Sequence, residues 1–188
     1  MSIMKANANK ATNDEAGMIP APTLEIAIEI ASPEWTAALA DAETIAERAL
    51  AAAYGALDHG DGDRPAEVSL VLADDAMVAD LNRDYRGKEG PTNVLSFAQQ
   101  EGDMPAGPAL PGMPEMLGDV VIAFGVTAAE AEDQGIPLAD HLSHLCVHGM
   151  LHLLGFDHID TDEADRMERL ETDILGGLGV PDPYGKER

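Results

Sequence analysis

The alternation of apolar and polar residues predicts four β-strands along this chain. Residues 24–30 alternate apolar and polar residues, which is typical of a half-buried strand, and residues 67–72 predict a second strand. A short run over residues 94–97 predicts a third. Residues 119–124 are nearly all apolar, so we expect this fourth strand to be buried in the centre of the sheet.

Apolar residues at helical spacing, together with helix-capping residues, predict five helices. Ser32 can cap and Pro33 can begin the first helix, and Asp74 can cap the second. Asp160 with Glu163 forms a capping box for the last helix. The expected helices cover residues 33–57, 74–85, 127–134, 137–154 and 161–176. This order predicts an α/β fold (α+β layered), with a small mixed sheet of about four strands packed against helices.

Composition indicates one compact unit in a reducing compartment. A chain of 188 residues is expected to form a single domain, here residues 23–188, after an N-terminal tail over residues 1–22 that we expect to be disordered. Cys146 is the one cysteine, and we expect it to be a buried small apolar residue. No run of 18 apolar residues and no secretory signal is visible, so we expect a cytoplasmic protein.

Two segments of the sequence are expected to form loops. Residues 59–65 are rich in glycine and aspartate. Residues 99–114 hold four prolines and three glycines. The position of this second loop next to the third strand makes it a candidate lid, and a plain surface loop explains it equally well.

Three histidines near the C-terminus have the spacing of a metal site. His148 and His152 are four residues apart, so on a helix they lie on one face and can point at a common atom. Gly155 can end that helix in a left-handed conformation, which returns the chain so that His158 reaches the same point. Three imidazoles with an open fourth position are typical of a catalytic Zn²⁺ site. Three unrelated histidines on a helix and its loop are the alternative.

The residue after the first histidine decides which zinc chemistry is plausible. The spacing matches the metzincin proteases, in which a glutamate after the first ligand is the general base. Here that residue is Gly149, which has no base. A general base contributes about 10²–10⁴-fold to catalysis, so a peptidase that lacks it would be slow. A metzincin-like zinc peptidase is therefore kept only as the alternative function.

Three blocks of sequence resemble the YbeY family of metal-dependent endoribonucleases, which act in ribosomal RNA maturation. The blocks are His148–His158, Leu81–Phe97 and Leu117–Ile122. The resemblance implies a zinc-dependent, single-strand-specific endoribonuclease that acts in ribosomal RNA maturation and ribosome quality control. It also implies one Zn²⁺ ion on a central helix, held by His148, His152 and His158.

The resemblance also implies roles for three further residues. Arg86 matches the arginine that the family places beside its metal, and a guanidinium there would bind the scissile phosphate. Asp157 is a catalytic candidate, although it is also placed to orient a ligand histidine. His144 is a third candidate, as a ligand, an acid–base group or a packing residue, whereas we expect His141 at the surface.

The negative charge of the chain limits how it can bind RNA. A net charge of −24 repels polyanions, so recognition has to depend on a local pocket or on a carrier. The expected partners are RNA, above all small-subunit ribosomal RNA, and the ribosome or its small-subunit proteins. Neither DNA nor a membrane is expected. A ribosome-assembly factor with a mainly structural metal is the remaining alternative.

Overall fold

The computed structural model describes residues 23–57, 65–99, 113–157 and 161–185. The expected tail over residues 1–22, most of both predicted loops, and His158 and Asp160 therefore lie outside the described residues.

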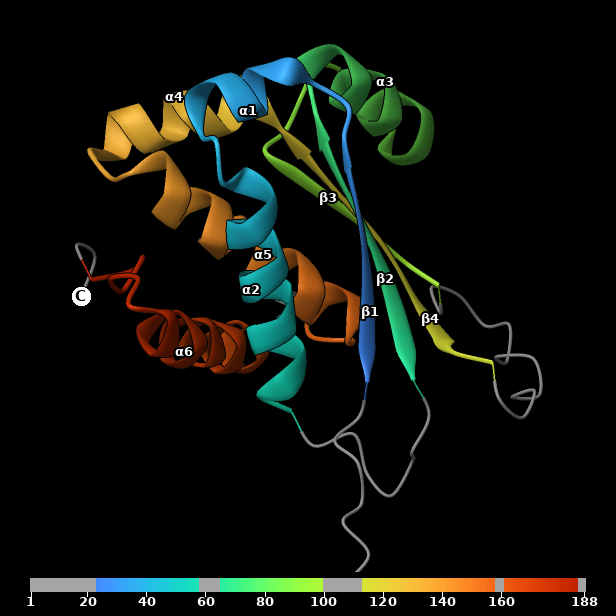
Figure 1. Cartoon of the computed structure of the whole chain (residues 1–188), viewed down its shortest axis with the longest axis vertical. Coiled ribbons are helices and arrows are strands. Elements are labelled where there is room, and N and C mark those ends of the chain that lie inside the picture. The colour runs from blue at the N-terminus through green and yellow to red at the C-terminus, as the bar shows by residue number, and fades with distance from the viewer. Residues whose placement is uncertain (1–22, 58–64, 100–112, 158–160, 186–188) are drawn as a thin grey trace, which may run out of the picture.

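A four-stranded mixed sheet forms the centre of the fold (Figure 1). Its strands are β1 (Leu24–Ile30), β2 (Ala66–Ala73), β3 (Val94–Ala98) and β4 (Glu115–Ala123), in the order β1-β2-β4-β3. β1, β2 and β4 are parallel, and β3 pairs antiparallel with β4 at the edge of the sheet. The predicted α/β class and the central position of the most apolar strand are both confirmed.

Six helices are seen in the described part of the chain. They are α1 (Pro33–Ala38), α2 (Ala42–Gly55), α3 (Asp75–Arg86), α4 (Phe124–Gln134), α5 (Leu138–Leu153) and α6 (Thr161–Leu178). None of these helices is long and apolar enough to cross a membrane. In Figure 1, α2, α5 and α6 lie on one side of the sheet, and α3 lies at its upper end on the other.

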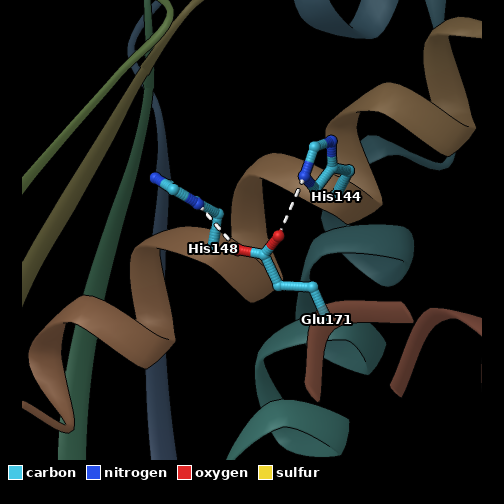
Figure 2. Close-up of side chains that lie close together, drawn as sticks. All are labelled: His144, His148 and Glu171. Atoms are coloured by element: carbon cyan, nitrogen blue, oxygen red, sulfur yellow. Dashed lines mark hydrogen bonds and ion pairs between the residues drawn. The ribbon is translucent and has the colours of Figure 1, made fainter. Parts of the chain in front are cut away.

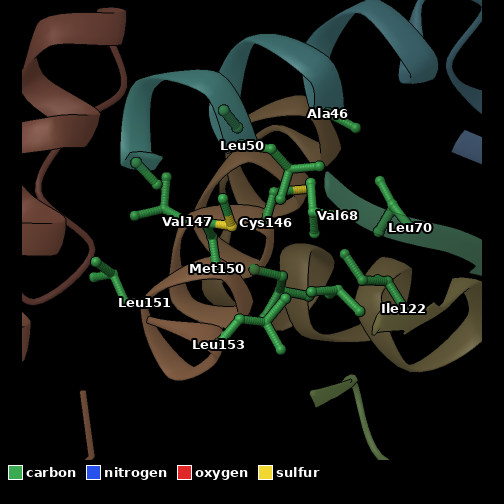
Figure 3. Packing of buried hydrophobic residues seen from close by; sticks show 14 of the residues in the cluster. Ala46, Leu50, Val68, Leu70, Ile122, Cys146, Val147, Met150, Leu151 and Leu153 are labelled. Atoms are coloured by element: carbon green, nitrogen blue, oxygen red, sulfur yellow. The ribbon is translucent and has the colours of Figure 1, made fainter. Parts of the chain in front are cut away.

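The main core lies between the sheet and the helix pair α2 and α5 (Figure 3). Alternate residues of β2, among them Val68 and Leu70, point into this core and meet Leu50 of α2 and Met150 of α5. Cys146 is fully buried there, and burial raises the pKa of its thiol, as expected for an apolar packing residue. α5 is therefore buried along much of its length, and this burial packs the histidine segment against the sheet.

The predicted first helix, residues 33–57, is wrong in one respect because the structure divides it into α1 and α2. The backbone at Leu39 is extended, with φ −144° and ψ 92°. Trp35 is fully buried and donates from its indole Nε1 to the carbonyl of Ala73 at 3.1 Å, which holds α1 at the end of the sheet. α2 packs along the face of the sheet, so the chain turns between α1 and α2. The alanine-rich sequence carries no glycine or proline that marks this turn.

Candidate metal centre

α5 carries four histidines, spaced three or four residues apart. The structure brings two of them, His148 and His152, together as their spacing predicts. Their Nε2 atoms are 3.0 Å apart, and their ring centroids are 4.5 Å apart. Gly155 has φ 86°, the left-handed conformation that was predicted to end this helix. Both imidazoles are only partly exposed.

Each of these two rings has its other nitrogen held by a group that accepts a hydrogen bond. Nδ1 of His152 lies 3.0 Å from the carbonyl oxygen of Phe156, which accepts only, so this nitrogen carries the proton. Nδ1 of His148 lies 2.7 Å from Oε1 of Glu171. The same tautomer in both rings directs the Nε2 lone pairs toward each other. A cation between them, either a proton or a metal ion, removes the repulsion that this close approach would otherwise cause.

Glu171, on α6, is a buried carboxylate that sequence reasoning missed. Its side chain lies between His144 and His148, with Oε2 3.4 Å from Nε2 of His144 (Figure 2). Tyr184, beyond the end of α6, donates its hydroxyl to the same oxygen. Burial raises the pKa of this carboxyl, but hydrogen bonds from His144, His148 and Tyr184 outweigh it and lower the pKa to about 2. Glu171 is therefore ionised at neutral pH.

One signal in the sequence could have revealed Glu171. The buried face of α6 is formed by Met167, Ile174 and Leu175, and Glu171 occupies the same helical stripe. A carboxylate within an apolar stripe is rarely fully buried unless it has a partner. No comparable signal marks Tyr184, because no periodic element contains it.

His144, His148 and Glu171 are also a group able to hold a metal ion. Each of them offers a ligand atom, and these atoms lie within 4.8 Å of one another. Two arrangements on α5 thus compete for a metal. One uses the facing Nε2 atoms of His148 and His152, and the other uses Glu171 as a ligand.

The remaining predicted site residues are placed as follows. Asp157 is half-buried and directly follows Phe156, whose carbonyl holds His152. Arg86 is exposed in the last turn of α3, and among the described residues no hydrogen bond or ion pair joins it to the histidines. His158 lies outside the described residues.

His141 is the histidine whose predicted position is wrong. It is 3% exposed rather than at the surface. Its Nε2 lies 2.8 Å from the carboxylate of Glu130, which also accepts from the side-chain amide of Asn93 at 3.0 Å. α4 packs against α5 and brings Glu130 to this face, so the helix has no open side there.

Gly149 lies where α5 comes closest to the sheet. A Cβ at this residue would lie 2.8 Å from Cγ1 of Val120 and 3.3 Å from the hydroxyl of Ser96. Ser96 donates this hydroxyl to the carbonyl of Gly149 at 3.3 Å. The residue after the first histidine therefore faces β3 and β4, and the packing leaves no room for a side chain.

Comparison with known proteins places the chain in a family. The family model described as Endoribonuclease YbeY matches residues 28–179. The Endoribonuclease YbeY of Paramagnetospirillum magneticum is 56% identical over 165 residues, which cover 88% of this chain and 98% of that protein. That of Rhodospirillum rubrum is 47% identical over 171 residues, covering 88% of this chain and 84% of that protein.

A similar solved structure is the solution structure of TM1509 from Thermotoga maritima. It is 19% identical, with a TM-score of 0.47, and the match covers 81% of this chain and 91% of that chain. The sequence matches are the ones that decide the family, because they extend over most of the chain at about half identity. The chain belongs to the Endoribonuclease YbeY family.

Proposed function

We propose that this chain is a zinc-dependent endoribonuclease that cuts single-stranded RNA in ribosomal RNA maturation and ribosome quality control. One observation carries the proposal: the Nε2 atoms of His148 and His152 face each other at 3.0 Å while an acceptor holds each Nδ1. Histidines that bind a catalytic metal have this pattern, with one nitrogen toward the ion and the other held from behind.

The facing nitrogens fit zinc better than the alternative group does. Zn–N bonds of 2.0–2.1 Å in a tetrahedral site separate two ligand nitrogens by about 3.3 Å, close to the observed spacing. Nδ1 of His148 is instead 2.7 Å from Glu171, which is a hydrogen-bond distance. We therefore assign the ion to His148 and His152, with His158 as the third ligand. A His₃ site leaves one position open for substrate or water.

The candidate site residues divide the work of the proposed reaction between them. When bound, zinc would act as a Lewis acid that polarises a phosphoryl oxygen and activates the attacking nucleophile, either water or the 2′-hydroxyl of the RNA. Arg86 binds the scissile phosphate through two guanidinium hydrogen bonds and neutralises charge that develops on its oxygens. Asp157 and His144 are the candidates for holding or moving a proton beside the leaving group.

The packing of Gly149 argues against the peptidase alternative. A glutamate at this residue would have to enter the space filled by Val120 and Ser96, so no general base can act from there. The assembly-factor alternative makes a different prediction: loss of a ligand would unfold the chain, whereas loss of a catalytic ligand leaves the fold intact. We place the activity in the cytoplasm, on RNA presented by the ribosome or its small-subunit proteins.

The test is cleavage of a single-stranded ribosomal RNA precursor by the purified chain, with and without a metal chelator. We expect cleavage that the chelator abolishes and added zinc restores. His152→Ala should remove activity, and Arg86→Ala should lower kcat/KM about 10²-fold or more, as loss of one preorganised donor does. Circular dichroism should show that both variants keep their fold.

The matched control is Arg48→Ala, because Arg48 is an exposed arginine on α2. It should cleave RNA like the wild type, which excludes a general effect of losing one cation. Equal cleavage by all variants would identify a contaminating ribonuclease and contradict the proposal. Cleavage of an unstructured protein substrate, with RNA left intact, would favour the peptidase.

A further inference from the structure

We propose that Glu171 is a positioning residue that fixes the tautomer of His148, and that Tyr184 and His144 hold Glu171 in place. The inference rests on the proposed metal centre and adds a second layer to it, contributed by α6 and the C-terminal segment. Figure 2 shows the carboxylate of Glu171 inserted between the two histidines.

The contacts of Glu171 account for both of its carboxylate oxygens. Oε1 accepts from Nδ1 of His148 at 2.7 Å. Oε2 accepts from the hydroxyl of Tyr184 and lies 3.4 Å from Nε2 of His144. The residue is fully buried, so these contacts stand in place of water. A carboxylate with three partners and no solvent is held in one orientation.

The two ring nitrogens of His148 make different contacts. Nδ1 points toward Glu171 on α6, and Nε2 lies 3.0 Å from Nε2 of His152. A proton fixed on Nδ1 leaves the Nε2 lone pair available to a metal ion. In His152 the carbonyl of Phe156 does the same for Nδ1 from its own chain segment. Glu171 and the carbonyl of Phe156 therefore play the same role for His148 and His152. The difference is that Glu171 comes from another helix.

Packing of α6 alone does not explain why a glutamate occupies residue 171. Met167, Ile174 and Leu175 are buried on the same face, and an apolar residue between them would complete the stripe. Replacing a buried ionic network with well-packed apolar residues is often neutral or stabilising. Orientation of His148 is a role that only an acceptor at this point can fulfil.

Tyr184 makes the C-terminal segment part of the same arrangement. Its ring meets the ring of His144 edge-on, with centroids 5.7 Å apart, and its hydroxyl reaches Glu171. Burial, the hydrogen bond to Glu171 and neighbouring carboxylates raise the pKa of this hydroxyl, so it stays a donor. Residues separated by 40 positions, His144 and Tyr184, thus meet around one carboxylate.

The test uses the full-length chain freed of metal and reads two quantities other than activity. Long-range ¹H–¹⁵N NMR of the imidazoles reports the His148 tautomer, and competition with a chromophoric chelator reports zinc affinity. We expect a protonated Nδ1 in the wild type. Glu171→Ala should release the tautomer and weaken zinc binding about 10–100-fold, the usual effect of losing an orienting partner.

Two conservative variants keep the proposal testable if Glu171→Ala folds poorly. Glu171→Gln retains an oxygen that accepts from Nδ1, so it should keep the tautomer and bind zinc much more tightly than Glu171→Ala does. Tyr184→Phe removes one donor and should weaken zinc binding by a smaller factor. Asp173→Asn, on the exposed side of the same helix, controls for the loss of one negative charge and should bind zinc like the wild type.

The outcomes separate this inference from the proposed function. Wild-type zinc affinity in Glu171→Ala would overturn the positioning role. Equal loss in Glu171→Gln and Glu171→Ala would also overturn it and would make Glu171 a direct ligand. If the wild type binds zinc with the expected tautomer but leaves RNA intact, the proposed function fails while the positioning role stands.

Discussion

At the scale of single residues, hydrogen bonds and close packing restrict the site side chains to one orientation. His148 and His152 have their Nδ1 atoms held, so their Nε2 atoms meet. Gly149 lies between them along the helix and faces the sheet with no space for a Cβ. The absence of a side chain at residue 149 therefore decides how closely the metal-site helix approaches β4.

Gly149→Ala should destabilise the chain. Its Cβ would approach Cγ1 of Val120 to 2.8 Å, and overpacking of this kind costs about 1–3 kcal/mol. Urea unfolding followed by circular dichroism measures the change in free energy of unfolding. The control is Gly176→Ala on α6, where nothing lies within 4 Å of the new Cβ. This control should gain about 0.5–1 kcal/mol from helix propensity, and a stabilised Gly149→Ala would show that α5 has room to shift.

At the scale of elements, helix ends are set by local residues while helix directions are set by packing. α3 begins after Asp74, as predicted, and the Asp74 carboxylate accepts from the backbone N–H of Met77 at 2.8 Å. The break between α1 and α2 has no such local marker, because buried Trp35 determines it. Elements with their own caps were predictable, and the one divided by a tertiary contact was not.

Asp74→Ala should lower the free energy of unfolding by about 1 kcal/mol, because the cap hydrogen bond to Met77 is lost. Asp41→Ala is the matched control, since Asp41 precedes α2 without a side-chain cap hydrogen bond. Both variants lose a negative charge near a helix N-terminus, so their difference isolates the hydrogen bond. Thermal and urea unfolding measure it, and equal losses in both variants would assign the effect to charge alone.

At the scale of the whole molecule, the proposed RNA substrate meets a chain of net charge −24. Arg83, which is close in sequence to Arg86, is held by Asp80 at 2.8 Å and by Asp84 at 3.0 Å. Arg83 is therefore engaged by carboxylates, which leaves fewer cations in this segment to contact phosphates. Long-range repulsion opposes encounter, and it weakens as salt screens it.

The salt dependence of RNA binding should therefore be shallow. If Arg86 and Lys88 each contact one phosphate, the slope of log K against log salt is no steeper than about −1.4, from about −0.7 per contact in single strands. Fluorescence anisotropy with a short RNA at several salt concentrations measures this slope. Arg86→Ala should make it shallower by about 0.7. A slope of about −4 or steeper would reveal a broad basic interface and contradict this picture.

Much of the fold followed from the sequence alone. Period-two alternation and helical spacing depend on nearby residues, so all four strands and most helix ends were predictable. The pairing of His148 with His152 and the left-handed turn at Gly155 followed for the same reason, since both are set within one helix and its end.

Only the tertiary structure decided what surrounds the four histidines of α5. Glu171 and Tyr184 reach them from 23 and 40 residues away, and Glu130 covers His141 from another helix. Such contacts depend on how α4, α5 and α6 pack, which no local pattern records. The sequence determined which imidazoles could share an ion. The packing of α6 against α5 determined which nitrogen His148 presents, because Glu171 holds its Nδ1.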